Sequence, residues 1–181
     1  SVVLIIIIVI FAYLSRERCK VWKDSITLWS DVIAKYPKVA MAYNNRGSAY
    51  LKGKDYGNAV HDLGKAIHIN PNYAKAYNNL CNAYNMNGER DRAVLMCKKA
   101  IAIDPRLQEA YNNLANIYAS VGKYEDAIVF YRQSLEIKGD YGVYNNLCIA
   151  YQNTGRYREA AESCGKAIAL KPDDPEAYNN L

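Results

Sequence analysis

The sequence predicts an all-α fold in which helix-turn-helix repeats follow a hydrophobic helix. The chain has 181 residues, of which 51% are hydrophobic and 23% are charged. This composition supports a packed core and excludes extensive disorder. Tyrosine occurs 17 times and asparagine 18 times, against only 2 phenylalanines. The motif Tyr-Asn-Asn accounts for much of both excesses, because it recurs at spacings of 34, 34, 33 and 34 residues.

The first element is an unbroken apolar run at residues 2–14. As a helix it spans about 20 Å at ~1.5 Å per residue, whereas a bilayer core of ~30 Å needs ~20 residues. We interpret residues 1–15 as a transmembrane helix truncated at its front, with Tyr13, the basic cluster 15–20 and Trp22 as interfacial anchors. The alternatives are a signal-peptide core, which a basic cluster after the run disfavours, and a buried helix or strand of a soluble domain.

Residues 16–39 are predicted to form a juxtamembrane segment and a degenerate half repeat. Leu28, Trp29 and Val32 have the spacing of a second repeat helix, and Pro37 falls where a closing proline would.

From residue 40 onward, each period predicts two amphipathic helices joined by a turn. A second tyrosine follows the first by seven residues, often with a leucine between, and forms the apolar side of the first helix. The turns contain Gly53, Gly88, Gly122 and Gly155. Small residues then mark where the second helix approaches closely: Ala59, Ala66, Ala93, Ala100, Ala127, Ser134, Ala160 and Ala167. Three periods close with Pro71, Pro105 and Pro172.

These residues resemble the tetratricopeptide repeat pattern, W-x2-L-G-x2-Y, then A-x3-F, then P, with Tyr in place of Trp. The resemblance implies a right-handed α-α superhelix. The expected repeats are 40–73, 74–107, 108–140 and 141–174, with a truncated fifth at 175–181. Because the third repeat lacks the closing proline and is one residue short, we expect an altered stacking angle there.

The apolar run, the junction and the repeats together resemble membrane proteins with tetratricopeptide tails. These include bacterial membrane-anchored proteins and the eukaryotic transmembrane and tetratricopeptide repeat family of O-mannosyltransferases. The resemblance implies a membrane-tethered scaffold that binds a peptide or partner protein. The alternative is the substrate-recruiting tail of a membrane glycosyltransferase, of O-mannosyl or O-GlcNAc type, whose catalytic part lies elsewhere. The positive-inside rule favours a cytoplasmic location of the repeats, whereas the resemblance implies an extracytoplasmic one. We adopt the extracytoplasmic location as the expectation.

Asparagines beside the tyrosine stripe are the candidate ligand-binding residues. The resemblance implies that they line the concave groove, as a similar ladder does in O-GlcNAc transferase-like arrays. An asparagine side chain has both donors and an acceptor, so it pairs with a peptide unit whatever side chain that unit carries. The alternative is that the second asparagine of each pair bonds between repeats and sets their stacking. The candidate groove residues are Asn44, Asn45, Asn78, Asn79, Asn82, Asn85, Asn112, Asn113, Asn116, Asn145, Asn146 and Gln152.

Other kinds of chemistry have no support in the sequence. It lacks a phosphate loop, a nucleophile-base arrangement and paired carboxylates, so we expect no enzyme active site. Metal-ligand spacings are also missing, and we expect neither a metal nor a cofactor. Residues 1–39 carry +3 of the formal net charge of +5, and the nearly neutral remainder argues against nucleic acid as a partner.

Four of the five cysteines form two couples, Cys81 with Cys97 and Cys148 with Cys164, each level across its predicted turn. Helix axes pack ~8–10 Å apart, whereas a disulfide needs Cα atoms within ~4.4–6.8 Å. We therefore expect unbonded apolar packing at these positions. Disulfides, tied to an extracytoplasmic location, are the alternative.

Overall fold

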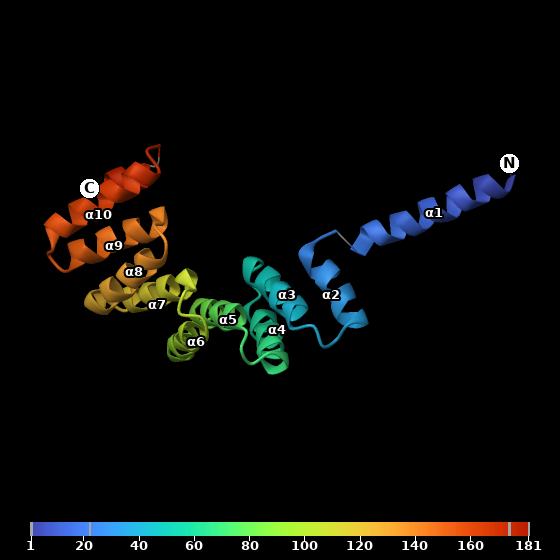
Figure 1. Cartoon of the computed structure of the whole chain (residues 1–181), viewed down its shortest axis with the longest axis horizontal. Coiled ribbons are helices and arrows are strands. Elements are labelled where there is room, and N and C mark those ends of the chain that lie inside the picture. Colours follow the sequence, from blue (N-terminus) through green and yellow to red (C-terminus); the bar gives the residue numbers. More distant parts are fainter. Residues whose placement is uncertain (1, 22, 174, 181) are drawn as a thin grey trace. The chain divides into compact units, whose positions relative to one another are not determined.

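The computed structural model describes residues 2–21, 23–173 and 175–180, in which every regular element is an α-helix (Figure 1). The contacts divide the chain into two compact units, residues 1–71 and 72–181, which are described separately. The first unit contains α1 (Val2–Val21), α2 (Ser25–Lys35), α3 (Ala40–Lys52) and α4 (Tyr56–Ile69). The second contains α5 (Ala74–Met86), α6 (Arg90–Ile103), α7 (Gln108–Ser120), α8 (Tyr124–Ile137), α9 (Tyr141–Asn153), α10 (Tyr157–Leu170) and α11 (Pro175–Asn179).

Helix α1 continues past the predicted end at residue 15, because no glycine or proline interrupts the basic segment that follows the apolar run. The large apolar side chains from Val3 to Leu14 are all exposed, by 43% to 70%. Among the described residues, no helix combines the length and apolarity needed to cross a membrane. The predicted anchor Trp22 and the side chains of residues 18–20 lie outside the described part of the chain.

Helix α2 begins with a reciprocal cap and packs against α3. The backbone N–H of Thr27 donates to Asp24 Oδ1 at 2.8 Å, and the N–H of Asp24 donates to Thr27 Oγ1 at 3.3 Å. The helix ends two residues before Pro37. It therefore lies beside α3 as the second helix of a preceding repeat would.

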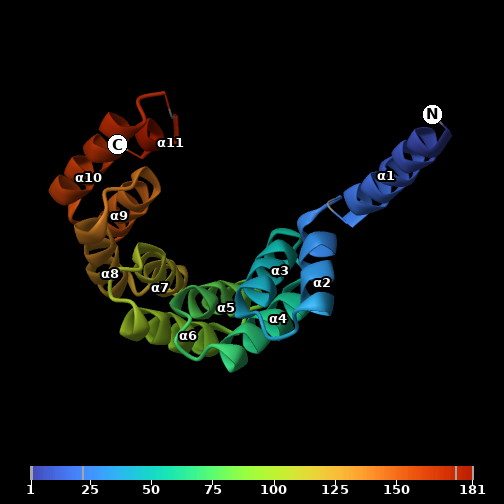
Figure 2. The ribbon, with the colours of Figure 1, turned by 45° about the vertical axis from the view of Figure 1, so that its right-hand side comes forward.

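Each repeat consists of two helices that pack side by side, as α9 and α10 do in Figure 2. Gly88, Gly122 and Gly155 occupy the left-handed backbone region in the turns, with φ of 84°, 76° and 74°. In the first repeat this conformation falls on Lys54, with φ of 61°, and not on Gly53, which precedes it. In this turn a lysine therefore adopts the left-handed conformation that glycine adopts in the later turns, and the glycine lies one residue before it.

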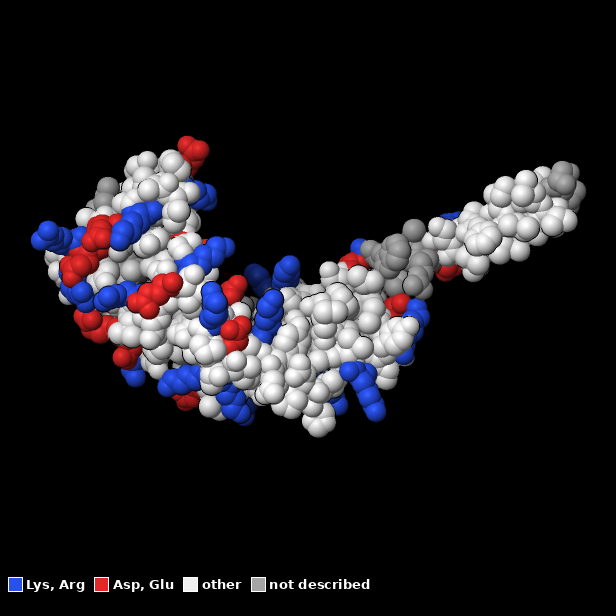
Figure 3. All heavy atoms as spheres, viewed as in Figure 1, with Lys and Arg blue, Asp and Glu red and all other residues white. Residues whose placement is uncertain are grey.

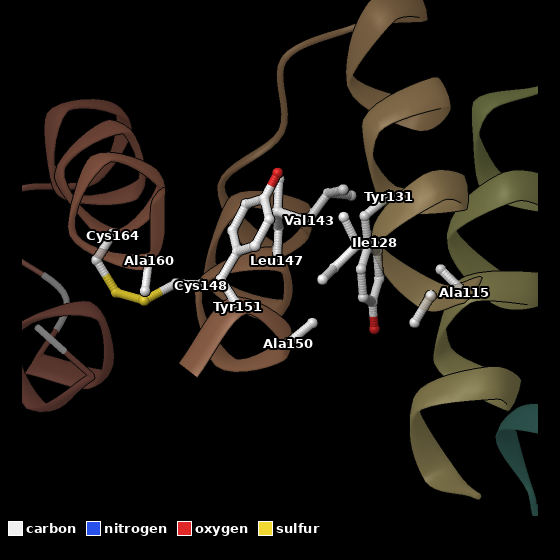
Figure 4. Packing of buried hydrophobic residues seen from close by; sticks show 11 residues of the cluster. Ala115, Ile128, Tyr131, Val143, Leu147, Cys148, Ala150, Tyr151, Ala160 and Cys164 are labelled. Carbon is white, nitrogen blue, oxygen red and sulfur yellow. A yellow bond between two sulfur atoms is a disulfide. The ribbon is translucent and has the colours of Figure 1, made fainter. Parts of the chain in front are cut away.

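The expectation of unbonded cysteines is wrong: Cys81 is joined to Cys97 and Cys148 to Cys164 by disulfide bonds. The Cα atoms of the two couples are 5.3 and 5.4 Å apart, within the range that a disulfide requires. Average helix spacing was the wrong guide, because fully buried alanines such as Ala93 and Ala100 bring the helices of a repeat together. Figure 4 shows the second bridge beside the core of the later repeats.

That core is built from the predicted apolar stripes. Leu147 and Tyr151 of α9 pack with Ile128 and Tyr131 of α8, and all four are buried (Figure 4). Between α7 and α8, the ring of Tyr118 stacks on the ring of Phe130 at a centroid distance of 5.5 Å. These contacts confirm the predicted all-α repeat solenoid.

The first repeat departs from this core, because Arg46 stands where later repeats have Leu80, Leu114 and Leu147. Its Nε and Nη2 atoms donate to the two carboxylate oxygens of Asp62 at 2.6 and 2.9 Å, and Nη1 donates to Ser30 Oγ at 3.0 Å. The side chain of Asp62 is only 2% exposed and that of Arg46 19%. The hydrogen bond to Asp62 raises the pKa of Arg46, so the guanidinium keeps its positive charge at this position.

We expect Arg46→Leu to lower the free energy of unfolding by about 3–5 kcal/mol, because it leaves the buried Asp62 carboxylate without its partner. Adding Asp62→Met creates the Leu and Met combination that the second repeat has at Leu80 and Met96. The double variant should regain wild-type stability or exceed it. Urea unfolding of the three proteins measures this, and a single variant as stable as wild type would contradict the role given to the pair.

Candidate functional site

The predicted groove residues of the second unit lie on α5, α7 and α9, on a surface that we call the amide face. It comprises the asparagine pairs and the polar residues three to seven positions beyond them: Asn78, Asn79, Asn82, Asn85, Asn112, Asn113, Asn116, Asn145, Asn146 and Gln152. Each first helix turns its tyrosine and leucine side chains into the core, as Tyr77 and Leu80 do. The helical period then directs the neighbouring asparagines to a different side.

Two hydrogen bonds between asparagine side chains join neighbouring repeats of the second unit. Asn113 Nδ2 donates to Asn78 Oδ1 at 2.9 Å, and Asn180 Nδ2 donates to Asn145 Oδ1 at 2.9 Å. The acceptors Asn78 and Asn145 are buried, with 9% and 4% exposure. In both cases the second asparagine of one pair bonds to the first asparagine of the preceding pair. This is the structural arrangement that the sequence left open as an alternative.

The step from the third to the fourth repeat has a different register. Asn146 Nδ2 donates at 3.2 Å to Asn116 Oδ1, four residues beyond the expected acceptor Asn112. The Oδ1 atom of Asn112 is buried and has no hydrogen-bond partner among the described residues. The change falls at the shortened third repeat. Its connection to α9 is capped by Asp140, whose Oδ1 accepts from the N–H of Val143 at 3.1 Å.

The remaining predicted residues differ in what they offer to a ligand. Asn82 is exposed, and Asn85 is half-buried; neither side chain forms a hydrogen bond within the described part of the chain. Gln152 Nε2 donates to the carbonyl oxygen of Asn180 at 2.6 Å. In the first unit, Asn44 is buried and its Nδ2 donates to Asn45 Oδ1 at 3.1 Å. Amide groups of α5 thus stay accessible beside the bonds between repeats.

A pocket of about 310 Å³ opens on the amide face among α7, α8 and α9. Its lining is Asn116, Ala119, Ser120, Tyr124, Tyr131, Asn146, Ile149 and Ala150. Burial raises the pKa of Tyr131, whose hydroxyl is neutral and donates to Asn116 Oδ1 at 2.6 Å. Sequence reasoning identified Asn116 and Asn146 but missed the other six lining residues.

A sequence signal for this pocket exists at the end of each first helix. The first helix of the third repeat ends with the small pair Ala119 and Ser120. The other repeats have larger pairs at the equivalent positions: Leu51 and Lys52, Asn85 and Met86, and Gln152 and Asn153. Small side chains at the end of α7 leave space that the larger pairs would fill.

Comparison with known families agrees with the periodicity. Residues 40–73, 74–107, 109–141 and 142–174 match the family model described as tetratricopeptide repeat. The mouse WD and tetratricopeptide repeats protein 1 is 43% identical over 56 residues, which is 29% of this chain and 8% of that protein. Serine/threonine-protein phosphatase T of Aspergillus oryzae is 36% identical over 52 residues, 29% of this chain and 11% of the phosphatase. The chain therefore spans about a tenth of the length of these curated relatives.

Solved structures resemble a much larger share of the chain. The crystal structure of MamA has a TM-score of 0.71 and 27% sequence identity, and the match covers 80% of this chain and 85% of MamA. A thermophilic repeat protein of Thermus thermophilus has a TM-score of 0.73, with 21% identity and 85% coverage of both chains. The latter likeness concerns the fold alone.

Proposed function

Because the chain belongs to the tetratricopeptide repeat family, we propose that it is a protein-binding scaffold that captures an extended polypeptide along its amide face. The observation that carries the proposal is the set of amide groups that stays accessible after the repeats have bonded to one another. Asn82 and Asn85 lie one helical turn apart on α5 with unused donors and acceptors. An amide that donates and accepts at once is complementary to a peptide unit.

The lack of charge on this surface supports a ligand that is bound through its peptide backbone. Asn82, Asn85 and the eight residues lining the pocket carry no formal charge. Binding of this kind depends on hydrogen bonds and shape, and it responds weakly to salt. The extended ligand would run from Asn82 and Asn85 on α5 along the amide face to the pocket beside Asn116 on α7.

We expect Asn82→Ala with Asn85→Ala to weaken the capture of unstructured peptides about thirty-fold, since each of the two lost hydrogen bonds contributes ~1 kcal/mol. The probe is a library of random synthetic peptides, and its best binder is then remade with N-methyl groups on alternate backbone nitrogens. Gln133→Ala, an exposed amide of α8, is the matched control and should bind as wild type. Binding that survives both the double variant and backbone methylation would exclude a backbone-reading amide face.

We further propose that α1 attaches the scaffold to a membrane. Its support is the exposed apolar surface of that helix, which Figure 3 shows as largely devoid of charged atoms on the visible side. The two disulfides favour an extracytoplasmic array, because such bonds persist in oxidising compartments. The recruiting tail of a membrane glycosyltransferase stays an alternative that rests on the junction sequence alone.

The tether predicts that the full chain floats with phosphatidylcholine vesicles in a density gradient. Ile6→Asp with Val9→Asp should abolish flotation, because a charge at the centre of a membrane helix costs about 2.5–3.5 kcal/mol. Leu95→Asp with Val129→Asp, which alters equally exposed apolar residues of α6 and α8, is the control. Equal flotation of all three proteins would rule out attachment through α1.

A further inference from the structure

We infer that the pocket among α7, α8 and α9 binds one uncharged aromatic side chain of the captured polypeptide, with tyrosine as the best fit. The inference rests on the proposed function and adds a side-chain preference to a surface otherwise complementary to peptide backbone. The pocket volume of about 310 Å³ lies at the lower end of the range for small-molecule sites, which suits a single side chain.

The walls of the pocket are apolar and aromatic. Ala119, Ile149 and Ala150 provide aliphatic surface, and Tyr124 and Tyr131 provide rings. Aromatic side chains pack well against such rings, in stacked or edge-to-face arrangements that contribute beyond the buried area. A flat ring therefore gains more from this lining than a flexible aliphatic chain does.

The polar atoms of the pocket favour a hydroxyl group over a plain ring. Tyr131 and Asn146 both donate to Asn116 Oδ1, which occupies the acceptor of that amide. Asn116 Nδ2 donates to no other described residue and is left to serve a ligand. Ser120 Oγ donates to the carbonyl oxygen of Ile117 at 2.8 Å, so its lone pairs can still accept. A phenol, which both accepts and donates one hydrogen bond, is complementary to this pair of groups.

Charged side chains are disfavoured at the same place. None of the eight lining residues is acidic or basic. A carboxylate or an ammonium group entering the pocket would lose water without gaining an ion-pair partner, which is costly. The preference is therefore for a neutral ligand group.

The pocket is specific to this step of the array, for two reasons that are visible in the chain. Ala119 and Ser120 replace the bulkier pairs that end the other first helices. The position of Tyr131 is held by Leu63, Cys97 and Cys164 in the other repeats, none of which carries a hydroxyl that could reach an amide. Grafting the pair from the fourth repeat, Ala119→Gln with Ser120→Asn, should fill the space.

The test titrates the full chain with N-acetyl-tyrosinamide and with the phenylalanine, leucine and glutamate analogues, followed by backbone amide NMR shifts. The tyrosine analogue should shift the signals of Ser120, Ile149 and Ala150 and bind about ten-fold more tightly than the leucine and glutamate analogues. The filled variant should lose this binding, whereas Ala161→Gln, which adds similar bulk on an exposed part of α10, should keep it. Equal binding by the filled variant, or equal affinity for leucine, would overturn the inference.

Ser120→Ala provides a readout that does not depend on added bulk. It removes the acceptor and leaves the walls unchanged, so it should reduce the preference for tyrosine over phenylalanine while both still bind. An unchanged preference would contradict the assigned role of Ser120. If the chain binds N-acetyl-tyrosinamide but captures no library peptide, the proposed function is wrong and the pocket assignment stands. If it captures peptides but does not bind N-acetyl-tyrosinamide, the pocket assignment is wrong and the proposed function stands.

Discussion

The close approach of the two helices within each repeat is the constraint on which the rest of the structure depends. In each repeat it occurs at one pair of residues that lie at the same level on the two helices. From the first repeat to the fourth, these pairs are Gly47 with Leu63, Cys81 with Cys97, Ala115 with Tyr131, and Cys148 with Cys164. A Cβ atom on Gly47 would lie only 2.8 Å from Leu63 Cγ, so the first pair tolerates no larger residue beside leucine. The space between the two helices is limited at every pair. A small residue packs against a large one in the first and third repeats, and a disulfide bond joins the helices in the second and fourth.

This approach determines what the outer sides of the first helices can do. Because tyrosine and leucine fill the inner side, the asparagines are left to join repeats and to face a ligand. Asn78 and Asn145 serve the first purpose as buried acceptors, and Asn82 is exposed for the second. At the step where one residue is missing, Asn116 becomes the shared acceptor, and the pocket lies beside it. Stacking and recognition thus use the same residue type in different environments.

The 34-residue period was enough to predict the helices and their tyrosine and leucine stripes, because these depend on local helical spacing. The leucines of the stripes are buried, whereas among the stripe tyrosines only Tyr77 and Tyr151 are fully so. The disulfides could not be predicted, since they depend on a separation of a few ångströms that buried alanines set. Arg46 was recognisable as a departure from a leucine position, but its pairing with Asp62 requires knowing which residues are level. The division of the asparagines between structural and accessible roles depends on repeat register, which one missing residue changes.

The most direct test of the close approach is to place cysteines at a level pair that lacks them. Gly47→Cys with Leu63→Cys puts thiols where the later repeats have Cys81 and Cys97. Counting reactive thiols in the unfolded, unreduced protein should give the wild-type number, because a third disulfide has formed. Leu63→Cys alone, which leaves Gly47 unchanged, should add one thiol. Two additional thiols in the double variant would show that the helices of the first repeat do not approach as described.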